Sequence, residues 1–425
     1  MTTPRNPITR RGFLAGTAAA AAFGTAAAMG IRPARAQKAP LRVGAMFPMS
    51  GIGAEAGAAW LLGTQLAVDQ WNRKGGVLGR QIELVVRDDK YSSAGAVTAG
   101  RELAGMGINL MVGASQSPMA LGLAPLLADM NAVCVAPTPS AMSLTHENFT
   151  RNFFRLCPNA SMLYGGLAQI LVEKNPEVSN WATIVFDSEY GHDAVRYFEH
   201  GIRQAAGTRE ITFEDPIYVP VNKTDFRVEI NQLMNSKAEG LYLGVIAAPA
   251  ISFLQQARSV GLNRKLKVMG EAGTDLLIAK AMQKSTPDNL WSVSYWHPQH
   301  EPFASNAMSQ QLYKDYVEKT GDKYPVGLLT SSHRSSLALF NGIEKAGDTD
   351  TQAVIAAMEG MTFDTIAGPY TIRKEDHQGH GHSVYAKVGP RDAEPFWGTN
   401  ELAFLEDASV MEPATPGTPF KLPTS

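Results

Sequence analysis

Short apolar runs rich in β-branched residues alternate with amphipathic segments along most of this 425-residue chain. The first pairs are a strand at 41–47 with a helix at 56–73, and a strand at 81–87 with a helix at 94–105. Strands that alternate with helices form βαβ units, which build a parallel sheet with helices on both faces. We therefore predict an α/β fold.

The alternation runs in two series, the second beginning near Cys157. The first series also contains strands at 109–112 and 132–136 and a helix at 118–130. The second is expected to contain helices at 162–174, 192–206, 226–236 and 250–260 and strands at 182–186, 211–218, 240–244, 267–270 and 291–295. Beyond it come helices at 304–320, 332–346 and 351–358 and strands at 370–373 and 384–388. Two series predict two lobes, and a small ligand commonly binds between lobes.

Composition excludes several other classes of protein. Basic and acidic residues nearly balance, 38 against 40, so nothing favours a nucleic-acid partner. Cys134 and Cys157 are too few for a disulfide scaffold or a structural zinc site. Both lie in short apolar runs, and the sequence leaves open whether they pair or stay as buried thiols.

Residues 1–36 have the organisation of an export signal. They contain five arginines and no acid, with Arg10-Arg11 ahead of an Ala/Gly-rich run and Ala34-Arg35-Ala36 as a small-x-small cleavage site. The arginine pair resembles a twin-arginine signal. We expect cleavage after Ala36 and a periplasmic mature chain, which has no other apolar stretch of about 20 residues that could span a membrane.

Two polar loops follow neighbouring strands of the first series. Ser115-Gln116-Ser117-Pro118 combines a serine N-cap with proline at the first helical position, and a helix N-terminus favours an anion. Thr138 and Ser140 follow the next strand. Ligands of open parallel sheets bind beyond the carboxyl ends of the strands, so both loops are predicted to meet one carboxylate. The simpler interpretation is a serine that only caps its helix.

Several short motifs occur in a fixed order along the chain: Pro48-Met49-Ser50-Gly51, Gly75-Gly76-Val77-Leu78-Gly79, Val112-Gly113-Ala114-Ser115, Ala136-Pro137, Ser188-Glu189-Tyr190-Gly191 and Gln256-Ala257-Arg258-Ser259-Val260-Gly261-Leu262. In this combination the chain resembles the type I periplasmic solute-binding proteins of the branched-chain (Leu/Ile/Val) amino acid ABC transporters. The resemblance covers nearly all of the mature chain. It implies two Rossmann-like lobes with parallel sheets, joined by a three-strand hinge.

The resemblance also implies that each lobe is built from separate segments. After the signal at 1–36, the first lobe would comprise 37–158 and 297–385. The second would comprise 159–296 and 386–412, followed by an irregular Pro/Thr-rich tail at 413–425. The chain would cross between the lobes near Pro158, Trp296 and 384–388.

Residue by residue, the family's carboxylate-binding positions fall on Ser117, Thr138 and Ser140, and its ligand-facing tyrosine falls on Tyr190. Gln116 lies within the same loop. All these positions keep hydrogen-bonding capacity, so the resemblance implies that carboxylate recognition is retained.

Other pocket positions depart from the leucine-binding pattern. Ala56 replaces an aromatic residue, Ser115 a leucine, and Ile246 or Ala247 a tyrosine. The acid that pairs with the ligand ammonium falls on Ala272 or, with a shift of one, on Glu271. Asp187 and Glu189 are further candidate acids, equally typical of solvated carboxylates. We expect a larger, more polar pocket than one for leucine.

The resemblance implies a substrate-binding component of an ABC importer. Closure of the two lobes would bury an amino acid or a related small carboxylate or amide, and an inner-membrane permease with its ATPases would then receive it. No cofactor is implied. A periplasmic ligand sensor of the same fold is the alternative that the sequence leaves open.

Enzymatic readings find little support in the residues. The chain has no G-x-S-x-G nucleophile elbow, and this weakens the hypothesis that it is an exported hydrolase. His377, His380 and His382 could together suggest a metal site, because imidazole binds zinc or nickel. A solvated loop before the last strand is the plainer interpretation, and we predict no metal.

Overall fold

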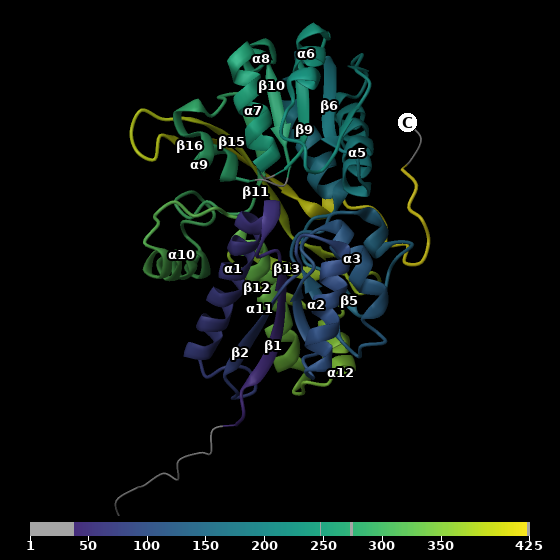
Figure 1. Cartoon of the computed structure of the whole chain (residues 1–425), viewed down its shortest axis with the longest axis vertical. Helices are drawn as coiled ribbons and strands as arrows, with labels where there is room; N and C mark the ends of the chain where they lie inside the picture. Colours follow the sequence, from purple (N-terminus) through teal and green to yellow (C-terminus); the bar gives the residue numbers. More distant parts are fainter. Residues whose placement is uncertain (1–37, 247, 273–274, 423–425) are drawn as a thin grey trace, which may run out of the picture. The chain divides into compact units, whose positions relative to one another are not determined.

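The computed structural model describes residues 38–246, 248–272 and 275–422. The predicted export signal lies outside the described residues. The segment that starts at Ala39 forms a compact unit of its own, and it contains two large sheets, each covered by helices on both faces (Figure 1).

The first sheet is wholly parallel, in the order β2-β1-β3-β4-β5. Helices α1, α11 and α12 pack on one face, and α2 and α3 pack on the other. The strands are β1 (Leu41–Phe47), β2 (Ile82–Asp88), β3 (Leu110–Gly113), β4 (Val133–Ala136) and β5 (Phe153–Arg155). The helices are α1 (Ala54–Arg73), α2 (Ser93–Gly105), α3 (Ser117–Leu123), α11 (Leu329–Ala346) and α12 (Thr351–Met358).

The second sheet is mixed, in the order β16-β15-β11-β10-β9-β6-β7, with β8 also paired to β6. Its parallel part comprises β6 (Asn180–Phe186), β7 (Thr212–Phe213), β8 (Ile217–Val219), β9 (Gly240–Gly244), β10 (Val268–Glu271) and β11 (Leu290–Ser294). Its antiparallel edge is the hairpin of β15 (His382–Pro390) and β16 (Trp397–Glu406). Its helices are α4 (Gly166–Lys174), α5 (Glu189–Ala206), α6 (Arg227–Asn235), α7 (Ala248–Val260), α8 (Leu262–Lys265) and α9 (Leu277–Met282).

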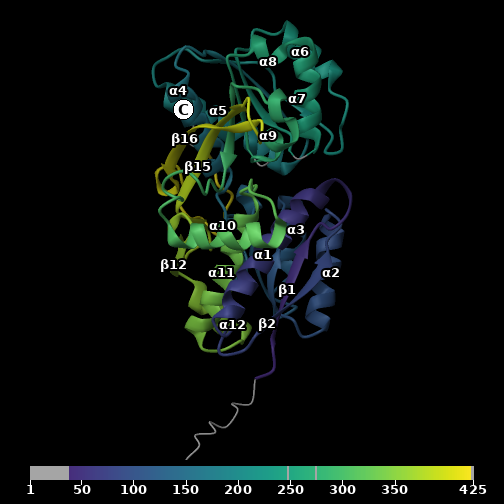
Figure 2. The same ribbon diagram turned by 90° about the vertical axis from the view of Figure 1, so that its left-hand side faces the viewer.

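A smaller antiparallel sheet, β12 (Thr362–Thr365), β13 (Gly368–Ile372) and β14 (Gly379–His380), follows α12. Helix α10 (Ala307–Thr320) lies beside α1 in Figure 2. It is fixed there because Asp315 accepts hydrogen bonds from Gln70 and Arg73, at 2.8 and 2.6 Å. The α/β fold with two lobes that we predicted is confirmed.

The chain passes between the sheets three times: after β5, after β11 and between β14 and β15. The domain boundary that we expected between residues 385 and 386 falls inside β15, which pairs with β11 along its whole Val384–Val388 stretch. The third passage therefore lies at about Gly381, a few residues earlier than expected.

The predicted secondary structure differs from the observed one at several places. The helix expected at 118–130 ends at Leu123 and continues only as a 3-10 turn, and the helix expected from 304 begins at Ala307. The strand expected at 211–218 is two short strands, β7 and β8. Strand β16 was not predicted, because its inward and outward residues do not alternate in hydrophobicity.

Close packing of α1 against α11 joins distant parts of the first lobe. Ser332 donates a hydrogen bond to the Trp60 carbonyl at 2.6 Å. A Cβ atom at Gly63 would lie 1.9 Å from the Leu329 carbonyl oxygen, so only glycine permits this approach. Trp60, Phe340 and Ile343 are buried in the same apolar cluster.

We therefore expect Gly63→Ala to force the two helices apart and lower the free energy of unfolding by roughly 1–3 kcal/mol. Gly105→Ala is the matched control, because nothing lies within 4 Å of a Cβ there. It should leave stability unchanged or raise it by about 0.5–1 kcal/mol, since alanine favours the helix. Urea unfolding of both variants measures the difference, and equal effects would contradict the packing argument.

Candidate ligand-binding site

A strained turn after β3 points a serine into the protein. Gly113 has φ +150°, and a Cβ there would lie 2.3 Å from the Met46 carbonyl oxygen; Ala114 follows at φ +53°. The next residue, Ser115, is fully buried, and its hydroxyl oxygen has no hydrogen-bond partner in the described structure. A buried polar atom without a partner is rare, and it is often satisfied by water or a ligand.

Ser117 does not cap its helix as predicted. Gln116 is the N-cap residue and makes no side-chain capping bond, and Ser117 is the first residue of α3. The Ser117 hydroxyl oxygen instead accepts backbone N–H bonds from Ser140 and Ala141, at 3.2 and 3.1 Å. Because α3 has only seven residues, its dipole adds little, and the loops themselves form the polar site.

The loops after β3 and β4 lie in direct contact. Besides the Ser117 bonds, Thr138 donates to the Ser115 carbonyl at 2.6 Å, and the Ser140 hydroxyl lies 2.9 Å from the Tyr164 hydroxyl. Two N–H donors occupy the lone pairs of Ser117, so its own O–H proton remains to be donated. A hydroxyl in that state suits an anionic acceptor.

The second sheet contributes a facing wall. Ser188 caps α5 by accepting from the Gly191 N–H, and this places Tyr190 in the first turn. Its hydroxyl donates to the Ala272 carbonyl at 3.2 Å, just beyond β10. Ile246 follows β9 and is buried, while Glu271 at the end of β10 is fully buried and accepts a hydrogen bond from Ser292.

Four tyrosines gather around this wall. The Tyr164 ring packs edge-on against Tyr190 and Tyr242, with centroids 6.0 and 5.8 Å apart. Burial raises the pKa of Tyr190, and Glu271 and Tyr91 add smaller upward contributions. Burial likewise raises the pKa of Tyr91 to about 12. The phenols therefore stay neutral near pH 7, able to donate and accept hydrogen bonds.

Hydrogen bonds also join the two lobes directly. The Met142 N–H donates to Asp193 of α5 at 2.9 Å, and the Ser143 hydroxyl donates to Glu189. Burial raises the pKa of Asp193. We call these two bonds the latch. Of the three acids considered for a ligand ammonium, Glu189 is therefore bonded within the latch. Asp187 is exposed and bonded to His192. Glu271 is the fully buried acid of the three.

Sequence reasoning missed Tyr91, Tyr164, Tyr242 and the latch. Tyr91 follows β2 in a turn with φ +54°, and its ring lies 2.3 Å from the place of a Cβ at Gly53. Tyr91 packs against the apolar cluster on the α2 and α3 side of the first sheet, whereas Ala56 is buried in the cluster on the opposite face. The larger pocket expected from Ala56 stays a prediction. The signal that could have pointed to Tyr91 was the Asp88-Asp89-Lys90-Tyr91 segment, which directly follows a predicted strand.

The histidines of the 376–382 segment lie in different surroundings. His377 is buried, stacked on Phe154 with centroids 3.9 Å apart, and its Nδ1 lies 3.1 Å from the Phe153 carbonyl. His380 is in β14, and His382 opens β15 on the exposed side. Within the described ranges, no group of three or more His, Cys, Asp or Glu side chains is placed to hold a metal ion. Cys134 and Cys157 are free and buried.

A buried carboxylate ties the second passage between the sheets to the start of α11. Asp275 accepts hydrogen bonds from the Ser294 hydroxyl and from the Leu328 N–H, the latter at 3.1 Å. Ser294 also lies 2.8 Å from His297 Nε2, and Thr399 lies 3.1 Å from His297 Nδ1. Burial raises the pKa of Asp275 to about 7 and lowers that of His297 to about 3.

With this geometry established, comparison with known proteins identifies the family. The family model described as periplasmic binding protein matches residues 40–392, so the chain belongs to that family. The resemblance to solute-binding proteins seen in the sequence is thereby confirmed. The family is one of solute-binding proteins, not an enzyme class. Among the described residues, no helix is both long and apolar enough to cross a membrane.

Individual relatives are distant but cover most of the chain. A Leu/Ile/Val-binding protein homolog of Brucella melitensis is 24% identical over 80% of this chain and 88% of its own length. The closed Leu-, Ile-, Val-, Thr- and Ala-binding protein of Brucella ovis has a TM-score of 0.76 at 18% identity, covering 90% of this chain and all of that one. An ABC-transporter solute-binding protein of Rhodopseudomonas palustris, solved with 3,4-dihydroxybenzoic acid, has a TM-score of 0.75 at 19% identity, covering 87% of this chain and 98% of that one.

The Asp275 carboxyl gives a test by pH. Its folded pKa of about 7 exceeds the usual 3.8, so ionisation destabilises the fold as pH rises from about 4 to 7. Asp275→Asn removes the ionisable group and with it this loss of stability. Asparagine also tolerates the φ of +52° at this position. Relative to the parent, the variant should gain about 2–3 kcal/mol between pH 5 and pH 8.

Thermal unfolding at both pH values measures this difference. Asp129→Asn, which alters an exposed carboxyl without a described partner, is the control and should follow the parent at both pH values. A constant offset between Asp275→Asn and the parent would show that Asp275 is ionised throughout.

Proposed function

We propose that this protein is the substrate-binding component of an ABC importer and captures a small carboxylate-bearing solute between its two lobes. The observation that carries the proposal is the pair of serines after β3. The Ser117 oxygen already accepts two N–H bonds, and the buried Ser115 hydroxyl beside it has no described partner. Two hydroxyls in this state suit the two oxygens of one carboxylate.

The remaining predicted residues complete the proposed site. Gln116, Thr138 and Ser140 would hold the carboxylate end from the first lobe. Tyr190, Ile246 and Glu271 would contact the rest of the ligand from the second lobe. Their positions beyond the carboxyl ends of the parallel strands of both sheets support this division, because ligands of open parallel sheets bind there.

Capture would proceed by closure of the lobes around the three chain passages. Ser140, a proposed ligand contact, lies two residues before Met142, which bonds Asp193 across the lobes. A ligand that orders the 138–143 loop would therefore also favour the latch. The closed form would be read by an inner-membrane permease with its ATPases.

The ligand class follows from the pocket positions. At Ser115 a hydroxyl stands where the leucine-binding pattern has an apolar side chain. The neighbouring tyrosines offer neutral aromatic rings, each with a hydroxyl that can form hydrogen bonds. Glu271 is bonded to Ser292, so a cationic α-ammonium is not the sole means of satisfying it. We therefore propose a small carboxylate or amide, amino acids included, whose side group is larger or more polar than that of leucine and in which the amino group is optional. The structural neighbour solved with an aromatic acid falls in this range, and leucine, isoleucine and valine, for which the relative is named, share the carboxylate end with it.

A periplasmic sensor of the same fold is the second candidate. It would bind the same ligand and present the closed form to a receptor in place of a permease. Uptake of radiolabelled ligand in cells that lack this protein distinguishes the two candidates. Loss of an importer component abolishes uptake, whereas loss of a sensor leaves the transporter in place.

We also propose that residues 1–36 direct export by the twin-arginine route. Arg10→Lys with Arg11→Lys should leave an uncleaved precursor in the cytoplasm, because that route recognises the arginine pair. Immunoblots of cell fractions measure the precursor and the mature chain. Normal periplasmic accumulation of the double variant would contradict the twin-arginine route and leave a general secretory signal.

Ser117→Ala tests the site. Loss of one hydroxyl to a charged acceptor should weaken binding by about 1.5–3 kcal/mol, roughly ten- to 150-fold. The ligand is first found by a thermal-shift screen of amino acids, aromatic acids, dicarboxylates and amides, since a bound ligand raises the melting temperature. Calorimetry then compares parent and variant.

Ser92→Ala is the matched control. Ser92 caps α2 by accepting from the Gly95 N–H, so its loss costs about 1 kcal/mol of stability without touching the proposed site. Unchanged affinity in Ser117→Ala would show that this serine only positions the 138–141 loop. Submicromolar binding of leucine with rejection of bulkier acids would overturn the proposed ligand class.

A further inference from the structure

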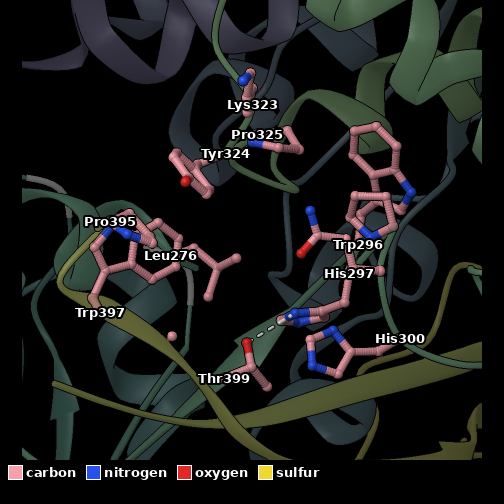
Figure 3. Close-up of a pocket in the computed structure, with 13 residues that line it drawn as sticks. Leu276, Trp296, His297, His300, Lys323, Tyr324, Pro325, Pro395, Trp397 and Thr399 are labelled. Atoms are coloured by element: carbon pink, nitrogen blue, oxygen red, sulfur yellow. Dashed lines mark hydrogen bonds between the residues drawn. The ribbon is translucent and has the colours of Figure 1, made fainter. Parts of the chain in front are cut away.

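A pocket separate from the proposed ligand site opens beside the second chain passage (Figure 3). We call it the side pocket. Pro395, Trp397 and Leu276 lie on one side of it, and Trp296 and His297 lie on the other. Tyr324 and Lys323 approach from a third direction. Ser115 and Tyr190 of the proposed ligand site are not among its lining residues.

The size of the side pocket selects a small occupant. Its volume is about 140 Å³. An apolar cavity of about 150 Å³ in another protein binds benzene, so this space suits one six-membered ring with a small substituent. Flat aromatic faces and prolines make up much of the wall, and such walls favour a planar ring.

The polar groups of the inner wall are already satisfied. The Trp296 indole N–H donates to Ser309 at 2.8 Å, so that indole has no free donor for an occupant. His297 is buried, with both ring nitrogens bonded, to Ser294 and Thr399. Burial lowers the pKa of His297 to about 3, and this ring is neutral at pH 7. The inner wall therefore offers an apolar surface without an unpaired charge.

The described lining of the side pocket includes one permanently charged side chain, the cationic Lys323. Lys323 is exposed, and no described hydrogen bond or ion pair uses its ammonium group. None of the described lining residues is an aspartate or a glutamate. A site for a cation would need acidic side chains beside its aromatic rings. A lysine without acids in the lining instead favours an anion at the mouth of the pocket.

We propose that the side pocket is a second small-molecule site, and that it binds a single-ring aromatic carboxylate. The ring would lie between Trp397 and Trp296, and the carboxylate would face Lys323. This goes beyond the proposed transport function, because the pocket shares no residue with the proposed ligand site.

An occupant would also contact both lobes. Leu276, which directly precedes α9, and Trp397 of β16 are buried in the core of the second lobe. Trp296 on the opposite wall packs in an apolar cluster with Leu66 of α1 and Leu329 of α11, both in the first lobe, whereas Tyr324 packs against the core of the second lobe. His297 at the pocket wall is linked through Ser294 to Asp275, which holds the Leu328 N–H at the start of α11. The occupant would thus stabilise one relative placement of the lobes.

The test titrates the purified protein with benzoate, using phenyltrimethylammonium as a cation of similar size. We expect benzoate to bind and to quench tryptophan fluorescence, and the cation to bind at least tenfold more weakly. Lys323→Gln should weaken benzoate binding about two- to fivefold, as for a solvent-exposed ion pair. Lys345→Gln on α11 is the matched control, and it should leave the affinity unchanged.

Two further variants separate the side pocket from the proposed ligand site. Trp397→Leu, with its fold checked by circular dichroism, should weaken benzoate binding tenfold or more. If that variant does not fold, Leu276→Phe fills the pocket from the same side and should have the same effect. Ser117→Ala should leave unchanged the benzoate binding that Lys323→Gln and Trp397→Leu weaken, even if it removes a separate binding event at the proposed ligand site. Benzoate binding that is lost in Ser117→Ala and unaffected by Lys323→Gln would assign benzoate to the lobe interface and overturn the second site. Absence of binding up to about 10 mM, or preference for the cation, would also overturn it.

Discussion

Parallel strands place all their carboxyl ends on one edge of a sheet, and this constraint organises the molecule. Each lobe has such an edge, and the loops that leave it carry the polar residues. Because three chain passages join the lobes, the two edges face each other and their loops bond across the interface. The Met142–Asp193 hydrogen bond is a direct consequence.

The fold was largely predictable from the sequence, because buried parallel strands and amphipathic helices have distinct local patterns. The strands at 41–47 and 240–244 were predicted with their observed limits. The two series of alternating strands and helices predicted two lobes, and the family motifs added the three-strand hinge and the separate segments of each lobe, which local pattern does not supply. Strand β16 was missed because it lies at a sheet edge, where most of its residues are half-buried on either face and the alternation that marks a strand is lost.

Individual roles in the site were less predictable, because they depend on contacts between residues far apart in sequence. Ser117 has the sequence context of a helix cap, and only its contact with the 140–141 backbone shows that it holds a neighbouring loop. Tyr164 lies in a π-helical turn, Ser161–Gly165, with no motif to mark it. Asp193 looks like an ordinary helix-face acid until Met142 is placed beside it.

The latch has a consequence for how affinity can change without altering selectivity. If only a fraction of free molecules is closed, the apparent dissociation constant equals the intrinsic one divided by that fraction. In the proposed mechanism, Asp193 and Glu189 would contribute to this fraction through Met142 and Ser143, although none of the four is itself a proposed ligand contact. Substitutions in the latch can therefore retune the concentration range in which the protein fills, while the order of preference among its ligands stays the same.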